Sequence, residues 1–150
     1  MYKKKFGAER VSKMLPHMIE VGRQTGIEFS YGGDTGNTFD SHRLILLAWK
    51  EGGQELQDRV VEELFSNYFE QEKFIGDMAV LEECAAKCGV AGFGQIKSDP
   101  DFLTDETMAE ISAYSRNVSG VPHFIVQDRH SLSGAQEADA FEEIFRKVAR

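Results

Sequence analysis

SGVPHFIV at residues 119–126 carries the strongest structural signal in this chain. SGAQ follows it at residues 133–136. The first segment places β-branched and aromatic residues directly after a proline, which favours a strand that begins at the proline. Polar residues 127–130 predict a turn, and residues 131–134 predict the returning strand of a hairpin. Apolar side chains recur at spacings of three and four over residues 139–150, which predicts a closing helix. The chain is therefore expected to end as a β-hairpin and a helix.

The preceding 117 residues are predicted to be mainly helical. Apolar spacing indicates an amphipathic helix over residues 6–25, in which Pro16 should cause a kink or a break. Gly52-Gly53 is expected to end the next helix. The helix after that pair ends in aromatic residues at 65–69, which should pack into the core.

Two further helices complete the helical part of the chain. Asp77 is a suitable N-cap and Gly89 a suitable C-terminal stop for a helix between them, and another helical stretch follows Asp105. We therefore expect a mainly helical region over residues 1–117 and a hairpin-helix region over residues 118–150, together forming one compact unit.

Composition and charge limit the classes of function that this chain can have. The chain has 150 residues, of which 41% are hydrophobic, a length that normally gives one globular domain. Its net charge of -8 argues against sequence-independent nucleic-acid binding, which depends on basic side chains. The first residues are basic but are not followed by an apolar run, and no stretch is long enough to span a membrane. We expect a cytoplasmic protein, or an organellar one whose targeting segment lies upstream.

Several motifs together resemble the DsbA-like family of thioredoxin-fold oxidoreductases, most closely its FrnE-like branch. The most specific are SGVP at 119–122 and SGAQ at 133–136. NT at 37–38 followed by SHRL at 41–44 is similar to the start of the helical domain that this family inserts in its fold. LF at 64–65 with YF at 68–69 resembles the next helix of that domain. The resemblance extends over nearly the whole chain.

This resemblance implies an α/β, thioredoxin-like fold with a large helical insertion. In the family, a β-α-β half that carries a Cys-x-x-Cys pair precedes the region at which Met1 begins. We therefore expect the redox motif and a central part of the sheet to be absent here. A hairpin alone is a marginal sheet, and its exposed edge favours pairing with another chain, so a homo-oligomer or partial disorder at that edge is expected.

The same resemblance implies five substrate-binding residues and no catalytic residue in this chain. A cis Val121–Pro122 bond would let Val121 offer its N–H and C=O to an extended substrate, although a trans proline at a strand start is the alternative. Asn37, His42 and Arg43 belong to a region that flanks the family's active-site cleft. In the alternative interpretation, His42 packs against the fold or caps a helix and Arg43 lies in solvent.

Cys84 and Cys88 are the two cysteines of the chain and lie one helical turn apart. They could form a redox pair or two metal ligands, but a tetrahedral metal site needs two more ligands, and the four histidines show no suitable spacing. We favour the interpretation that both are small apolar side chains packed in the core. No metal site is predicted.

The predicted function is therefore that of a DsbA-family thiol-disulfide oxidoreductase-like protein that lacks its own Cys-x-x-Cys pair. Its partners would be protein or peptide dithiols or disulfides, and no cofactor is expected. The alternatives are a non-catalytic module that binds a peptide, glutathione or a partner, and a fragment of a glutathione-dependent isomerase or kappa-type transferase, which would act on a glutathione conjugate. Binding to nucleic acid or membranes is not expected.

Overall fold

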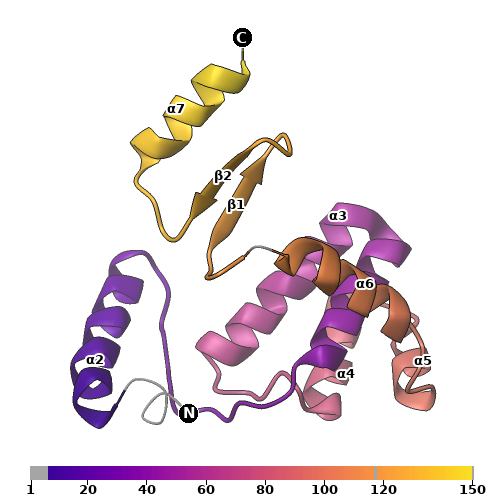
Figure 1. The fold of residues 1–150 in the computed structure, drawn as a ribbon. Coiled ribbons are helices and arrows are strands. Elements are labelled where there is room, and N and C mark those ends of the chain that lie inside the picture. The colour runs from indigo at the N-terminus through magenta and orange to yellow at the C-terminus, as the bar shows by residue number, and fades with distance from the viewer. Residues whose placement is uncertain (1–6, 117, 150) are drawn as a thin grey trace. The chain divides into compact units, whose positions relative to one another are not determined.

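The computed structural model describes residues 7–116 and 118–149, and the chain divides into two compact units. The first unit, Met1–Thr107, is helical, and the second, Met108–Arg150, contains a hairpin and a helix (Figure 1). The division lies upstream of the boundary expected between residues 117 and 118. The expectation of one compact unit stays a prediction.

Helix α2, Ala8–Gln24, opens the described part of the first unit. It runs through Pro16 as one helix, so of the two outcomes expected there, a kink or a break, the break does not occur. Proline removes one N–H donor, and a helix can accommodate that loss by bending instead of ending. After a turn at Gly26, residues 27–38 form a connecting segment without helix or strand.

Helix α3, Phe39–Phe69, consists of two helical segments joined at Gly52 and Gly53. Gly53 has a φ of 62° and a ψ of -155°, so the backbone leaves the helical region at this residue. A positive φ is readily accessible to glycine because glycine has no Cβ. The break predicted at the glycine pair is confirmed.

Helix α4, Met78–Cys88, has the caps that its sequence predicts. The Asp77 carboxylate accepts a hydrogen bond from the Ala79 N–H at 2.7 Å, and Gly89 ends the helix with a φ of 85°. These two residues satisfy backbone groups that would otherwise lack partners at the helix ends.

Helix α5, Phe93–Ser98, was not expected from the sequence. The turn before it is held by α3, because the Ala91 and Gly92 N–H groups donate to the Glu51 carboxylate at 2.8 and 2.7 Å. A carboxylate is favourable at this position because free N–H groups gather at a helix start. The start of α5 therefore depends on a residue about 40 positions upstream.

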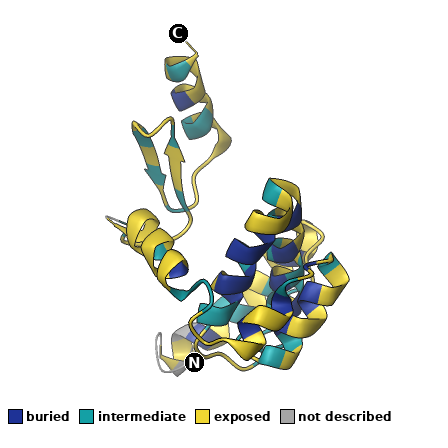
Figure 2. Cartoon of the chain, turned by 90° about the vertical axis from the view of Figure 1, so that its right-hand side faces the viewer, coloured by how far each residue is buried: buried dark blue, intermediate teal, exposed yellow. Residues whose placement is uncertain are grey.

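Helices α3, α4 and α5 enclose the main hydrophobic core of the first unit, and Figure 2 shows buried residues concentrated on them. The buried members are Leu44, Leu47, Ala48, Leu56, Val60, Leu64, Leu81, Cys84, Ala85, Val90, Phe93 and Ile96. Burial of this apolar surface is the main stabilising contribution to the unit.

Helix α6, Thr104–Ser115, follows α5 and contains the boundary between the two units. Thr107 is its buried residue, and most of its remaining side chains are exposed. Across the described residues, no helix combines the length and the hydrophobicity required to cross a bilayer.

In the second unit, strands β1, His123–Val126, and β2, His130–Ser133, pair as an antiparallel hairpin. The connecting residues Gln127 and Asp128 both have positive φ, a feature of the hairpin turns whose twist matches that of the strands. The strand pairing confirms the hairpin predicted from the sequence.

Helix α7, Ala138–Val148, lies beside this hairpin (Figure 1). The ring of Phe141 meets the ring of Phe124 edge-on, with 4.9 Å between centroids. Ile144 is the buried hydrophobic residue of this unit among those described. The second unit therefore has a much smaller core than the first.

Candidate functional site

The residues with the most specific sequence signal, Val121 and Pro122, lie directly before β1. Their peptide bond is cis, and Val121 is 86% exposed. The Pro122 carbonyl accepts a hydrogen bond from the Gly134 N–H at 2.8 Å, which joins the proline to the end of β2. Gly134 follows the end of β2 and has a φ of 80°, a conformation readily accessible to glycine.

The strand register determines which backbone groups of β1 remain free. Phe124 lies opposite Leu132 and Val126 opposite His130, while Pro122 bonds to Gly134. Backbone groups in an antiparallel pair alternate between facing the partner strand and facing away. Residues 123 and 125 therefore direct their N–H and C=O groups to the outer edge of β1.

The side chains of β1 differ between its two faces. Phe124 packs on Phe141, whereas Ile125 is 55% exposed. His123 is half-buried, and its Nδ1 has no hydrogen-bond partner among the described residues. Burial along β1 does not alternate, because His123 and Val126 are half-buried while Phe124 and Ile125 between them are exposed.

Asn37 and His42 lie at the start of α3 in the other unit. The Asn37 side-chain oxygen accepts a hydrogen bond from the Phe39 N–H at 3.0 Å, so this residue fixes the turn into the helix. His42 follows one turn later and is exposed. Both side chains are accessible, and their role in ligand binding stays a prediction.

Arg43 has a different environment from both interpretations made from the sequence. Its side chain is 3% exposed and forms an ion pair with Asp40 at 2.8 Å. Its guanidinium also donates to the Phe102 carbonyl at 2.8 Å and to the Asp99 carbonyl at 2.7 Å. The alternative in which Arg43 lies in solvent is wrong, because the side chain is buried and these acceptors satisfy its donors. This placement argues against direct ligand contact and makes Arg43 the residue that holds the loop before α6.

The two cysteines lie in the core region, as the favoured interpretation predicted. Both are free thiols, Cys84 buried and Cys88 half-buried. Burial raises the pKa of Cys84 to about 12, and the adjacent Cys88 adds to this effect. Burial also raises the pKa of Cys88. Because the thiolate is the reactive form, neither cysteine is activated for disulfide exchange.

No metal-binding cluster of histidine, cysteine or carboxylate residues is found in the described ranges.

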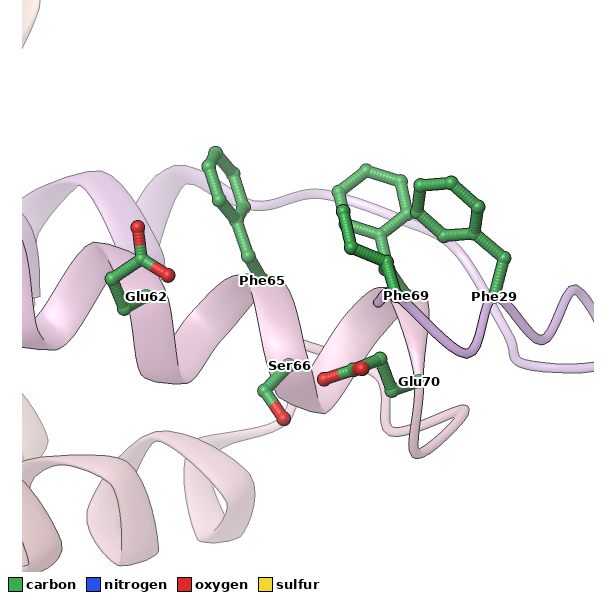
Figure 3. Close-up of a pocket in the computed structure, with 7 residues that line it drawn as sticks. Phe29, Glu62, Phe65, Ser66, Phe69 and Glu70 are labelled. Carbon is green, nitrogen blue, oxygen red and sulfur yellow. The ribbon is translucent and has the colours of Figure 1, made fainter. Parts of the chain in front are cut away.

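A groove that the sequence did not predict lies at the end of α3. It has a volume of about 350 Å³ and is lined by residues of α3 and of the connecting segment: Ile27, Phe29, Glu62, Phe65, Ser66, Phe69 and Glu70. Figure 3 shows the rings of Phe65, Phe69 and Phe29 in a row, with Glu62 beside Phe65. The prediction that the aromatic end of this helix packs into the core is wrong for Phe65, which is 53% exposed.

A second hollow of about 320 Å³ shares Phe65 and Phe69 with this groove. Its other lining residues are Thr35, Gly36, Thr38, Tyr68, Phe74 and Ile75. The recurrence of aromatic residues over positions 65–74 was the sequence signal that could have identified these hollows, but the same pattern also predicts a core-facing helix.

The connecting segment that supplies Phe29 is held in place by Glu72. The Glu72 carboxylate accepts hydrogen bonds from the Ser30 hydroxyl and, at 2.9 Å, from the Gly32 N–H. These two bonds, the Ser30 bond first, lower the pKa of Glu72. The Ser30 N–H also donates to the Phe69 carbonyl at 2.7 Å. The wall of the groove is thus anchored to the end of α3 by polar contacts.

Comparison with known proteins agrees with the fold. The model of the family described as DSBA-like thioredoxin domain matches residues 2–146, nearly the whole chain. No curated protein matches the chain. The match confirms the α/β, thioredoxin-like fold with its large helical content that residues 119–136 led us to expect. The chain belongs to the DSBA-like thioredoxin domain family, a family of thiol-disulfide oxidoreductases.

Proposed function

We propose that this chain binds extended peptide or thiol substrates along the outer edge of β1 and that its 150 residues contain no redox-active cysteine pair. The observation that carries the proposal is the contrast between an accessible edge and inaccessible thiols. Val121 is exposed beside free backbone groups, whereas Cys84 is 1% exposed. This is a DsbA-type docking edge without an attacking sulfur.

The chemistry of disulfide exchange supports the second half of this proposal. Exchange begins when a thiolate attacks a disulfide sulfur, and reactive thiols have a lowered pKa and an accessible position. Cys84 and Cys88 have raised pKa values, and their thiols face the Val60 and Arg59 carbonyls. Disulfide exchange would therefore need a nucleophile from outside the 150 residues of this chain.

An insulin-reduction assay tests this point directly. With dithiothreitol present, the chain should leave the rate of insulin precipitation at the level given by dithiothreitol alone. Acceleration in proportion to protein concentration would overturn the proposal. A Cys84→Ala, Cys88→Ala double variant is the control that separates activity of these thiols from any other source.

Backbone amide shifts test the docking edge. Titration with an extended dithiol peptide should shift the amide signals of Val121, His123 and Ile125. The amides of Phe124 and Val126 face β2 and serve as matched controls that should move less. Equal shifts along the whole strand, or none, would contradict docking at the edge.

Glutathione in the same titration distinguishes the binding-module alternative. Shifts at the edge caused by glutathione, but not by the peptide, would favour a glutathione-binding module on the same fold. Shifts caused by the peptide alone would favour the protein-substrate role.

We also infer that the free edge of β1 pairs with a second copy when no substrate is bound. β1 contains no charged residue and no proline, the devices that commonly protect sheet edges. Sedimentation velocity should therefore show a concentration-dependent oligomer. Ile125→Lys should shift the population toward monomer, whereas Met108→Lys, a similarly exposed site on α6, should leave it unchanged.

A further inference from the structure

The groove at the end of α3 combines an aromatic floor with a carboxylate at each end. The rings of Phe65 and Phe69, and those of Phe69 and Phe29, meet edge-on with 5.8 Å between centroids in each pair. Figure 3 shows Glu62 at one end of this row and Glu70 near the other. The groove thus presents apolar surface and negative charge together.

The two carboxylates are available to a cation. Glu62 is exposed and forms no hydrogen bond or ion pair within the described part of the chain. Glu70 accepts one long hydrogen bond, from the Glu28 N–H at 3.4 Å. Other glutamates nearby are already paired, such as Glu63 with Lys87 at 2.5 Å. With a net charge of -8, the chain attracts cationic partners to such a site.

The size of the site indicates a peptide. Two hollows, of about 350 and about 320 Å³, lie against the shared rings of Phe65 and Phe69. A single small molecule would occupy one of them, whereas a peptide can place one apolar side chain in each. The exposed ring of Phe65 also offers its face to a lysine or arginine, an attraction of about 0.5–1 kcal/mol at an exposed site.

We propose that this groove binds a segment of a partner protein that carries two apolar side chains and a lysine or arginine. The apolar side chains cover the exposed ring of Phe65 and the half-buried ring of Phe69, and the cation pairs with Glu62 or Glu70. This site shares no residue with β1 and requires no redox activity. Its test therefore stands whether or not the proposed docking edge is correct.

Fluorescence anisotropy with the full chain provides the test. The probe is a short labelled peptide in which leucine and phenylalanine alternate with lysine, and its partner probe replaces every lysine with glutamate. The lysine peptide should bind at least about tenfold more tightly, and added salt should weaken its binding. Equal binding of both peptides would overturn the proposal, as would no binding of either.

Variants locate the binding on the groove. Phe65→Ala should weaken the lysine peptide about tenfold, because exposed aromatic anchors dominate binding at such sites. Trp49→Ala is the matched control, since Trp49 is 50% exposed but does not line the groove, and it should leave affinity unchanged. Equal losses in the two variants would contradict the proposal.

A charge exchange gives the sharpest result. Glu62→Lys should weaken the lysine peptide and strengthen the glutamate peptide, each by about threefold to tenfold, whereas the exposed Glu55→Lys should change both much less. If Glu62→Lys and Glu55→Lys act alike, binding depends on overall charge and the groove is not the site.

Discussion

The two units of this chain differ in how completely they bury their apolar surface. Helices α3, α4 and α5 share a core in which Leu44, Val60 and Leu81 are fully buried. The hairpin and α7 bury Ile144, while Ile125 and Phe145 remain more than half exposed. The first unit has the core of an independent domain, whereas the second resembles a sheet that needs more strands. The unit with the most specific family motif thus has the smaller hydrophobic core of the two.

The largest expected effect comes from opening a cavity in the helical core. Leu81→Ala should lower the free energy of unfolding by about 3–5 kcal/mol, because Leu81 is fully buried and a cavity would remain. Urea unfolding followed by the fluorescence of Trp49, the single tryptophan, measures this loss. Met108→Ala, at an exposed site, should change stability by less than about 0.5 kcal/mol. If Leu81→Ala lowered the free energy of unfolding by less than about 1 kcal/mol, the first unit would not have the well-packed core described above.

Substitution of Arg43 tests whether buried polar contacts contribute as much to the stability of the helical unit as its hydrophobic core does. Arg43→Met should cost about 2–4 kcal/mol, because it removes the donors to two backbone carbonyls and to Asp40. Arg43→Lys retains the charge but loses the planar arrangement of donors, so an intermediate loss is expected in the same urea experiment. If Arg43→Met were neutral, Arg43 would be free for the ligand contact first expected of it.

Phe141 tests the independence of the second unit. Phe141→Ala removes the edge-on contact with Phe124 and should speed amide exchange in β1 and β2 about tenfold, equivalent to about 1.4 kcal/mol. The Trp49 transition should stay unchanged, because Trp49 lies in the other unit. Equal losses in both units would show that they unfold together, and the contrast between them would then be wrong.

The smallest expected effect is the acid sensitivity that Glu72 contributes. Its pKa is lowered in the folded chain by the Ser30 hydroxyl and the Gly32 N–H, so the folded state binds its proton less readily than the unfolded state. The resulting stabilisation is complete above the ordinary value of 4.5 and is lost as the pH falls through the lowered pKa. Glu72→Gln should therefore destabilise the chain at about pH 7 and have less effect at about pH 3. Glu55→Gln, which is exposed, should show no such difference, and the same pH dependence in both variants would exclude a special role for Glu72.

Local patterns were sufficient to predict much of the fold. The caps at Asp77 and Gly89, the break at Gly52-Gly53 and the hairpin after Pro122 all depend on residues close to one another in sequence. Each reflects a backbone preference or a nearby hydrogen bond. The burial of Cys84 was also predicted, because its helix has an apolar face at that position.

The candidate site was less predictable because its properties depend on distant residues. Phe65 has the spacing of a core residue, yet the connecting segment leaves its ring exposed and forms a groove beside it. Periodicity identifies an apolar face but not how completely other elements cover it. The Val121 edge could be recognised from its motif, while its free backbone groups became evident from the strand register.

Sequence alone was enough to assign the family motif, the helical character of the first part and the hairpin of the last part, because these follow from local backbone preferences and apolar spacing. Three features required the folded chain: the burial of Arg43 by carbonyls 56 and 59 residues away, the contact of Glu51 with the start of α5, and the exposed ring of Phe65. Each depends on which side chains meet across large sequence separations. Such meetings are set by the packing of whole elements and leave little trace in the pattern of any one of them.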